Sequence, residues 1–242
     1  MTSPSSSHSY PSYAEPVLLA LTVVTGLVDA VSYLALGRVF TANMTGNVVL
    51  LGFAAAGAQE LSVLRSGAAL GAFLIGAVVG GRMSRPIRLG VWHRWTSFAF
   101  GVEGALFLAA MAVAIGQPSG FSNDASRLYT IIVLTGVAMG MRNATVRSLA
   151  VPDHTTTVLT LTLARLAADT RLAGGDNHRW ASRASSVVTM IAGAAMGTWL
   201  LRHSVMLPLA IAGAVSVLCA VVVYLEVRPG GAPAHPSPPA RN

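Results

Sequence analysis

The chain has 242 residues, of which 53% are hydrophobic and only 10% are charged. Soluble domains carry about 25% charged residues, so this composition excludes an ordinary soluble domain and predicts one membrane domain of roughly six to eight crossings. The net charge of +7 does not indicate nucleic-acid binding, because the 16 basic residues, all of them arginine, are scattered between apolar segments.

The predicted membrane domain covers residues 16–227 and leaves a tail at each end. The first 15 residues are rich in Ser and Pro, and no basic stretch precedes the first apolar run. This pattern predicts a disordered N-terminal tail and a retained first helix, because a cleaved signal peptide begins with a basic region. The repeated Pro and Gly of residues 228–242 predict a second disordered tail.

The first spanning helix is predicted over residues 16–36, which is about the length that a bilayer core requires. It contains Asp29, and its polar side chains recur at helical spacing, so they form one polar stripe. An ionised carboxylate at this depth costs roughly 2.5 to 3.5 kcal/mol on insertion scales. We therefore expect Asp29 to face the interior of the bundle and to have a partner there.

A polar cluster follows at residues 40–47, with the sequence Phe-Thr-Ala-Asn-Met-Thr-Gly-Asn. Asn, Thr and Gly begin helices, and the free N–H groups of a helix N-terminus attract anions and polar groups. The apolar helix that starts here, over residues 44–57, would be about 21 Å long and too short to cross a core of roughly 30 Å. It is predicted to be broken or re-entrant. We expect a substrate or ion site at its N-terminus, formed by Asn43, Thr45, Gly46 and Asn47.

Two further spans complete the first half. Residues 66–81 carry two GxxxG pairs, which let helix backbones approach closely and predict packing faces. The pairs are Gly67 with Gly71 and Gly76 with Gly80. A dense group of arginines follows, and residues 97–116 form the next apolar segment, which contains Glu103.

From residue 126 the chain repeats the order of its first half. The corresponding features are Thr25-Gly26 and Thr135-Gly136, the polar cluster and the threonine-rich residues 155–162, and the glycine pairs Gly76/Gly80 and Gly193/Gly197. Identity between the halves is weak, so this hypothesis depends on order and spacing. It predicts repeats at about residues 16–117 and 126–227, and a second short helix at residues 155–168.

The arginines distinguish two topologies. If both short helices cross the membrane, there are eight spans and the loop arginines divide evenly, which gives no orientation. If neither crosses, there are six spans, and twelve arginines share the side of both termini against four on the other. The positive-inside rule favours six spans with cytoplasmic termini in a bacterial inner membrane. The predicted fold is thus an all-α integral membrane protein of about six spanning helices plus two short ones, in two inverted repeats.

Two stretches resemble the YoaK family of bacterial integral membrane proteins. The first runs over residues 26–34 and 40–47, and the second joins Met141-Arg142-Asn143-Ala144 to Thr156-Thr157-Val158-Leu159-Thr160. The resemblance covers about residues 17–227, and the second stretch departs from the family pattern where Thr160-Leu161 replaces a Thr-Gly. It implies a multi-pass inner-membrane protein with no established activity, and it supplies no substrate and no catalytic residue.

Asp29 and Arg142 lie on the corresponding first helices of the two repeats, about one turn apart. We expect them to pair, which would neutralise both charges. Two roles stay open for the pair. Asp29 takes up a proton or cation while Arg142 biases it or holds an anionic substrate, or else the pair is fixed and locks the bundle. Glu103 is expected to reach the interface and is a weaker candidate for a direct role.

The leading functional hypothesis is a small secondary transporter or permease for a small polar or anionic solute. Its site would lie where the two repeats meet, formed by Asp29, Asn43, Thr45, Gly46 and Asn47 against Arg142, Asn143, Thr156, Thr157 and Thr160. The alternative is a non-transporting membrane scaffold or sensor subunit, in which these residues only cap helices and hold the bundle together. A transporter needs a water-reachable cavity at these motifs, whereas a scaffold can be dry there.

Other kinds of chemistry lack their sequence signatures. The chain has no Ser-His-Asp elbow, phosphate loop or dinucleotide fingerprint, its histidines form no metal spacing, and Cys219 is its single cysteine. We therefore expect no enzymatic activity, no metal and no cofactor. The expected partners are the lipid bilayer and a small solute, without nucleic acid, and we expect a homodimer for so small a bundle.

Overall fold

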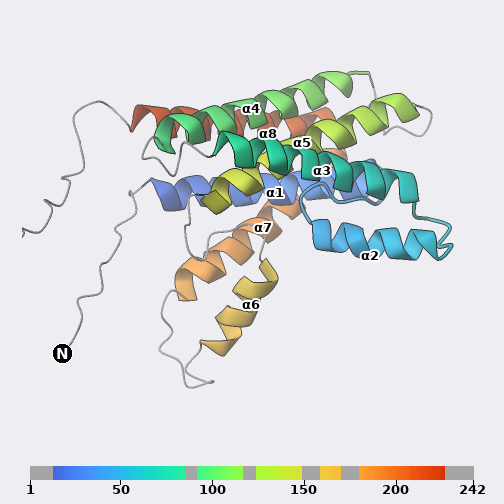
Figure 1. Ribbon diagram of the computed structural model, residues 1–242, viewed down its shortest axis with the longest axis horizontal. Coiled ribbons are helices and arrows are strands. Elements are labelled where there is room, and N and C mark those ends of the chain that lie inside the picture. The colour runs from blue at the N-terminus through green and yellow to red at the C-terminus, as the bar shows by residue number, and fades with distance from the viewer. Residues whose placement is uncertain (1–12, 85–91, 117–123, 149–158, 170–179, 227–242) are drawn as a thin grey trace, which may run out of the picture.

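In the computed structural model the described residues form α-helices (Figure 1). The residues that it describes are 13–84, 92–116, 124–148, 159–169 and 180–226. The helices are α1 Ala14–Ala35, α2 Met44–Ala55, α3 Val63–Met83, α4 Trp92–Val113, α5 Ala125–Ser148, α6 Leu159–Ala168, α7 Trp180–Leu201 and α8 Met206–Leu225. No strand occurs within these residues, and the predicted all-α fold is confirmed.

Six of the described helices are long and two are short. Five of the long ones, α1, α3, α4, α7 and α8, are also apolar enough to cross a membrane. α5 has 24 residues, but Arg142 and Asn143 lower its hydropathy. α2 has 12 residues and α6 has 10. At 1.5 Å per residue they reach about 18 and 15 Å, which is too short for a core of roughly 30 Å.

The path of the chain places α2 at one end of the bundle. α1 begins at the end where α8 finishes, and it stops near the start of α3 at the opposite end (Figure 1). α2 follows α1, packs on α3 and does not continue to the far end. The predicted short helix therefore begins partway along the bundle, on its outer side, and runs back to the end at which α1 stops (Figure 1).

The long helices pack in pairs, with α1 along α7, α3 along α5 and α4 along α8. If the first four helices correspond to the last four, α1 with α7 is the same pair as α5 with α3. The short helices follow the same order, because α2 packs on α3 and α6 packs on α7. This pairing is what an internal repeat would produce, while the repeat and its division at residues 117–126 stay a prediction.

Glycines bring two of these pairs into close contact. A Cβ atom built on Gly76 of α3 would collide with the backbone of α5, and a Cβ on Gly193 or Gly197 of α7 would collide with α1. Around Gly67 and Gly71 of α3, in contrast, there is open space. Only the second predicted GxxxG pair of α3 is therefore a packing face between described helices.

α4 and α8 approach each other through Gly104 and Gly213. A Cβ on Gly104 would lie 3.0 Å from the carbonyl oxygen of Gly213, and a Cβ on Gly213 would lie 3.1 Å from that of Gly104. Each glycine also faces the side chain four residues beyond the other, which is Val217 or Leu108. Such reciprocal contacts arise where two segments are related by a two-fold axis. They support inverted repeats with an axis between α4 and α8.

Two helices begin earlier than predicted. α3 starts at Val63 because the hydroxyl of Ser62 caps it, accepting a hydrogen bond from the N–H of Arg65 at 3.3 Å. α4 starts at Trp92, so Arg94 belongs to the helix and not to the preceding charged segment. Hydropathy marks where a charged stretch meets an apolar one, and both helices extend beyond that point.

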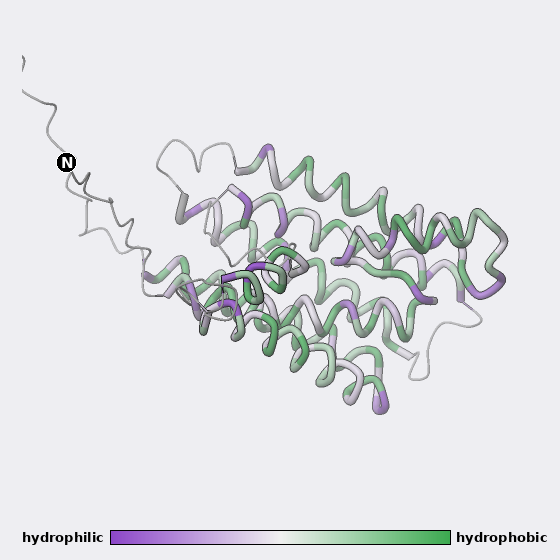
Figure 2. The backbone as a smooth tube through the Cα atoms, turned by 90° about the horizontal axis from the view of Figure 1, so that it is seen from below, coloured by the Kyte–Doolittle hydropathy of each residue, from purple (hydrophilic) through white to green (hydrophobic). Residues whose placement is uncertain are grey.

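The buried core lies between α1, α4, α5 and α8, and many apolar side chains elsewhere are exposed. Fully buried side chains include Leu21, Phe107 and Leu209. Exposed ones include Leu64, Ile75 and Val188, and apolar residues run along the whole length of the helices (Figure 2). Soluble proteins rarely expose apolar surface on this scale, whereas a bilayer covers it.

Candidate functional site

A buried ion pair joins the two halves of the chain. Arg142 on α5 and Glu103 on α4 face each other, and both side chains are fully buried. Arg142 Nε donates to Glu103 Oε2 at 2.9 Å, and Nη2 donates to Oε1. The ring of Phe107 lies 5.9 Å from Arg142 Cζ. Two-point contact between guanidinium and carboxylate is among the strongest charge-assisted geometries in proteins.

Polar groups from two more helices surround this pair. Arg142 Nη1 donates to the carbonyl oxygen of Leu21 at 2.8 Å and to Thr25 Oγ1 at 3.0 Å, both on α1. The hydroxyl of Ser216 on α8 donates to Glu103 Oε1 at 2.7 Å. The pair and its partners therefore connect four helices and leave the two charges neutralised.

The predicted pair between Asp29 and Arg142 is wrong. The donors of Arg142 go to Glu103 and α1, and none of them reaches Asp29. Glu103 is expected from its segment to reach the interface, but it is fully buried, because Arg142 and Ser216 compensate for its desolvation. α4 starts at Trp92, so Glu103 lies about halfway along the helix. The apolar stretch begins only at residue 97, and hydropathy alone therefore places Glu103 too near the end of the helix.

Asp29 lies one helical turn beyond Thr25 on α1 and makes a different set of contacts. The residue is only 8% exposed. Its Oδ1 accepts a hydrogen bond from the backbone N–H of Ala42 at 3.1 Å, and the N–H groups of Asn43 and Thr41 add weaker interactions with the same carboxylate. Within the described ranges no cationic side chain pairs with it. Asp29 thus holds the loop before α2 without a countercharge.

Two asparagines shape the start of α2. The side-chain oxygen of Asn43 accepts a hydrogen bond from the N–H of Gly46 at 3.3 Å, as an N-cap does. Asn47 is buried, and its side-chain amide bonds to both backbone groups of Phe40, with the N–H at 2.9 Å. A Cβ on Gly46 would lie 3.0 Å from the Phe40 ring, and Thr45 is exposed. Asn43 and Asn47 therefore have the capping roles that the scaffold alternative expects.

Thr41 is a further candidate site residue in this loop. It precedes the N-cap, a position that does not distinguish it from other threonines in the sequence. The residue is fully buried, yet its hydroxyl has no hydrogen-bond partner in the part of the chain that the structure describes. Leaving a buried polar group unpaired costs roughly 1–3 kcal/mol. Burial is the property that singles out Thr41, and only the fold shows it.

The residues predicted for the second half do not join Asp29 in the described part of the chain. Asn143 is partly buried on α5, and Thr160 is exposed on α6, which packs on α7. Thr156 and Thr157 lie outside the described residues. The structure thus places Asp29 against the loop before α2, and the predicted site, including the meeting of the two short helices, stays a prediction.

The two sites offer carboxylates, a guanidinium, hydroxyls and backbone amides. These groups support ion pairing, hydrogen bonding and, at Asp29, proton uptake. Among the described residues no group of three His, Cys, Asp or Glu side chains could hold a metal ion. Cys219 is a buried free thiol on α8.

Comparison with known proteins identifies the family. A family described as "Protein of unknown function (DUF1275)" matches residues 17–223. The UPF0700 transmembrane protein YoaK of Bacillus subtilis (strain 168) is 33% identical over 157 residues, which cover 65% of this chain and 67% of that protein. No solved structure matches the chain significantly. The resemblance to the YoaK family is confirmed, and the chain belongs to the DUF1275 family and is a multi-pass membrane protein.

Proposed function

We propose that this protein is a small secondary transporter or permease for a small polar or anionic solute. The observation that carries the proposal is Asp29, a buried carboxylate that has no charged partner in the described residues and holds the loop before a short helix. Ionisable residues are costly inside a membrane, and where they occur they mark ion or substrate pathways.

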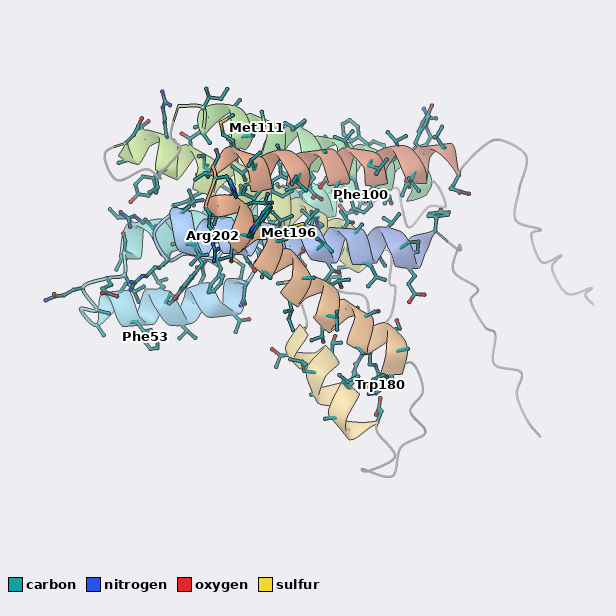
Figure 3. The ribbon with its side chains drawn as sticks, turned by 180° about the vertical axis from the view of Figure 1, so that it is seen from behind. Phe53, Phe100, Met111, Trp180, Met196 and Arg202 are labelled. Carbon is teal, nitrogen blue, oxygen red and sulfur yellow. The ribbon has the colours of Figure 1, made fainter. Side chains whose placement is uncertain are left out.

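The geometry of α2 supports the same function. Its preceding loop directs backbone N–H groups at Asp29, and broken helices with inward N-termini form substrate and ion sites in transporters. Asn47 is the one residue that is buried within the bounds of α2, and Phe53 points away from the bundle (Figure 3). The helix is therefore held mainly by its first turn, so it is free to shift when the loop is released.

The pairing of the long helices supports an alternating mechanism. Two halves related by an axis between α4 and α8 could exchange conformations and open the site to each side in turn. The halves are not alike in this structure, because α7 is inclined to the other long helices and α6 lies beside it, away from α2 (Figure 1). This asymmetry is what one of two alternating states would look like.

Arg142 has a structural role in this proposal. Its donors are taken up by Glu103 and α1, so it stabilises the bundle and does not hold the solute. A scaffold would need the same network, and this observation favours the non-transporting alternative. The two functions differ at Asp29, because a scaffold needs only the hydrogen bonds between Asp29 and the loop, whereas the proposed transporter also needs its charge to change.

Proteoliposomes under a pH gradient test the proposal. Purified protein is reconstituted, and uptake of radiolabelled lactate, phosphate and glycine is measured with and without the gradient. We expect gradient-dependent uptake of at least one solute, lost in Asp29→Asn and reduced in Asn47→Ala. Asp124→Asn is the matched control, because it makes the same chemical change at a partly exposed carboxylate that pairs with Arg127.

The outcomes separate the two functions. Uptake that is unchanged in both Asp29→Asn and Asn47→Ala would remove the proposed site. No uptake of any of the three solutes by the parent protein would favour the scaffold.

We also propose an inner-membrane location with both termini in the cytoplasm. Six crossings put twelve arginines on the side of the termini and four on the other, and the excess remains when the buried Arg142 is left out. C-terminal fusions test this orientation. We expect a fluorescent GFP fusion and an inactive alkaline phosphatase fusion, and the reverse pattern would contradict it.

A further inference from the structure

Three successive backbone N–H groups meet a carboxylate at the start of α2. The N–H of Ala42 donates to Asp29 Oδ1 at 3.1 Å, and those of Thr41 and Asn43 interact with the same carboxylate. Successive N–H groups in a turn form an anion-binding concavity, and this one lies at the positive end of a 12-residue helix. We name residues 41–43 the amide cradle.

A second observation indicates that the cradle has a donor that Asp29 does not use. The hydroxyl of Thr41 is fully buried and has no hydrogen-bond partner within the described residues. A threonine Oγ1 is three bonds from its own backbone nitrogen, so this donor lies beside an N–H group of the cradle. Buried hydroxyls normally have partners, and the unpartnered one points to a ligand that the cradle accepts.

We propose that the amide cradle binds a small monocarboxylate anion in place of Asp29 when Asp29 is protonated. The class of ligand follows from the present occupant, because the cradle already holds a carboxylate through its N–H groups. A free anion would gain the hydroxyl of Thr41 as an additional donor. This inference names the substrate class of the proposed transport site and rests on that function for its role in the cell.

Charge requires that the proton and the anion bind together. Two carboxylates in one buried cradle would repel each other, so the anion enters only after Asp29 is neutralised. Asp29 forms no ion pair in the described part of the chain. Arg38 pairs with Glu60, Arg65 of α3 lies next to Gly37, and Arg202 and His203 follow the end of α7. Arg142 and Glu103 neutralise each other, Arg183 of α7 pairs with Asp169, and α2 and α8 carry no Asp, Glu, Lys, Arg or His.

The exchange involves hydrogen bonds and one proton, and no covalent bond between heavy atoms changes. A proton from water binds a carboxylate oxygen of Asp29, and the neutral carboxyl group releases the N–H groups of the cradle. The oxygens of the anion then accept hydrogen bonds from these N–H groups and from the hydroxyl of Thr41. One proton and one anion are bound per site, so no net charge is added.

The test measures proton uptake by the full-length protein in detergent. Sodium acetate is added to a weakly buffered solution at mildly alkaline pH, at which Asp29 is ionised before the anion binds, and the pH change is followed while equilibrium dialysis counts the bound radiolabelled acetate. We expect about one proton taken up for each acetate bound. Sodium chloride at the same concentrations controls for ionic strength and is expected to cause no stoichiometric uptake.

Three variants identify the groups involved. Asp29→Asn is neutral at every pH, so it is expected to bind acetate without proton uptake. Thr41→Val keeps the shape of the side chain and removes the hydroxyl, and acetate should bind about tenfold more weakly. Thr198→Val is the matched control, because this threonine is exposed on α7, and its affinity for acetate should equal that of the parent.

Each outcome decides the inference. No acetate binding by the parent protein, binding without proton uptake, or unchanged affinity in a folded Thr41→Val would overturn it. The measurement on the parent protein needs no variant, so misfolding of a variant does not obscure the result. Coupled binding without transport in vesicles would keep the cradle and overturn the transport proposal. Gradient-driven uptake of glycine without acetate binding would keep the transport proposal and overturn the cradle.

Discussion

Two carboxylates are buried in the same bundle and are held in opposite ways. Glu103 is paired with Arg142 and accepts a hydrogen bond from the hydroxyl of Ser216, at a point where four helices meet. Asp29 has no cationic partner in the described residues and is held by the N–H groups of one loop. The comparison teaches that the pair is part of the framework, whereas Asp29 is held only by hydrogen bonds to one loop, as the proposed proton uptake requires.

The same comparison predicts how each site responds to substitution. Removing one charge at Glu103 leaves a buried, uncompensated guanidinium, and burying a lone charge is the most costly defect available here. Removing the charge at Asp29 leaves no lone charge buried, and the oxygen of a neutral amide accepts hydrogen bonds from the backbone N–H groups more weakly than the carboxylate does. Substitutions at the two sites should therefore differ strongly in how much stability they remove.

The largest expected effect is that of Glu103→Gln. It leaves Arg142 charged and buried without a countercharge, so we expect a loss of about 3–5 kcal/mol in the free energy of unfolding. Unfolding by SDS titration in detergent micelles measures this loss. Asp124→Asn is the control, because a surface pair contributes only about 0–1 kcal/mol. Equal stability of the two variants would contradict the framework role of Glu103.

The double variant Glu103→Gln with Arg142→Met sharpens this result. Because it removes both charges, no lone charge remains buried, and replacing a whole ion pair is often close to neutral. We expect the double variant to be more stable than Glu103→Gln alone, in the same SDS titration. A double variant that loses the sum of the two single effects would show that the residues do not interact.

Much of this architecture follows from the sequence because it depends on lengths and on charge counts. The segment from Met44 is too short to cross a bilayer whatever its neighbours are, and α2 does end at Ala55. The arginines favour six spans over eight, and six long helices occur among the described residues. Asp29 contacts the loop before α2, because the chain between them is short.

The ion pair and Thr41 could not be predicted, because both depend on packing between distant segments. Arg142 and Glu103 are 39 residues apart, and either carboxylate, Asp29 or Glu103, could have satisfied the arginine. Which carboxylate pairs with Arg142 depends on where α4 starts, and α4 starts before the apolar stretch. Thr41 resembles the other threonines of its cluster, and only its burial distinguishes it.

The next largest loss of stability is expected for a substitution at Gly76, where α3 packs on α5. Gly76 sets the approach of α3 to α5, which carries Arg142, so Gly76→Ala should cost about 1–3 kcal/mol through overpacking against the backbone. Gly71→Ala is the matched control on the same helix, because its Cβ meets open space and alanine favours the helix by up to about 1 kcal/mol. A similar loss in both variants, measured by thermal unfolding, would contradict the packing of α3 on α5.

A smaller effect is expected for Asn47→Ala, which acts on the loop that Asp29 holds. The substitution removes both hydrogen bonds to the backbone of Phe40, so we expect a loss of about 1–2 kcal/mol. Limited proteolysis should show faster cleavage near residues 40–47, while the rest of the bundle stays resistant. Asn143→Ala on α5 is the comparison variant, and equal cleavage of the loop in both would mean that Asn47 does not fix it.

The smallest effect on stability, less than about 1 kcal/mol, is expected for Asp29→Asn, and this variant separates the two carboxylates most clearly. The N–H groups of residues 41–43 bind the ionised carboxylate best, so their protection should be greatest where Asp29 is charged and should fall as the pH falls and the group is protonated. Hydrogen exchange of peptides covering residues 40–47, corrected for the intrinsic dependence on pH, measures this protection. Asp29→Asn cannot change its charge, so its corrected protection should be the same at both ends of the pH range. A fall in corrected protection that is as large in Asp29→Asn as in the parent protein would mean that a group other than Asp29 loosens this loop.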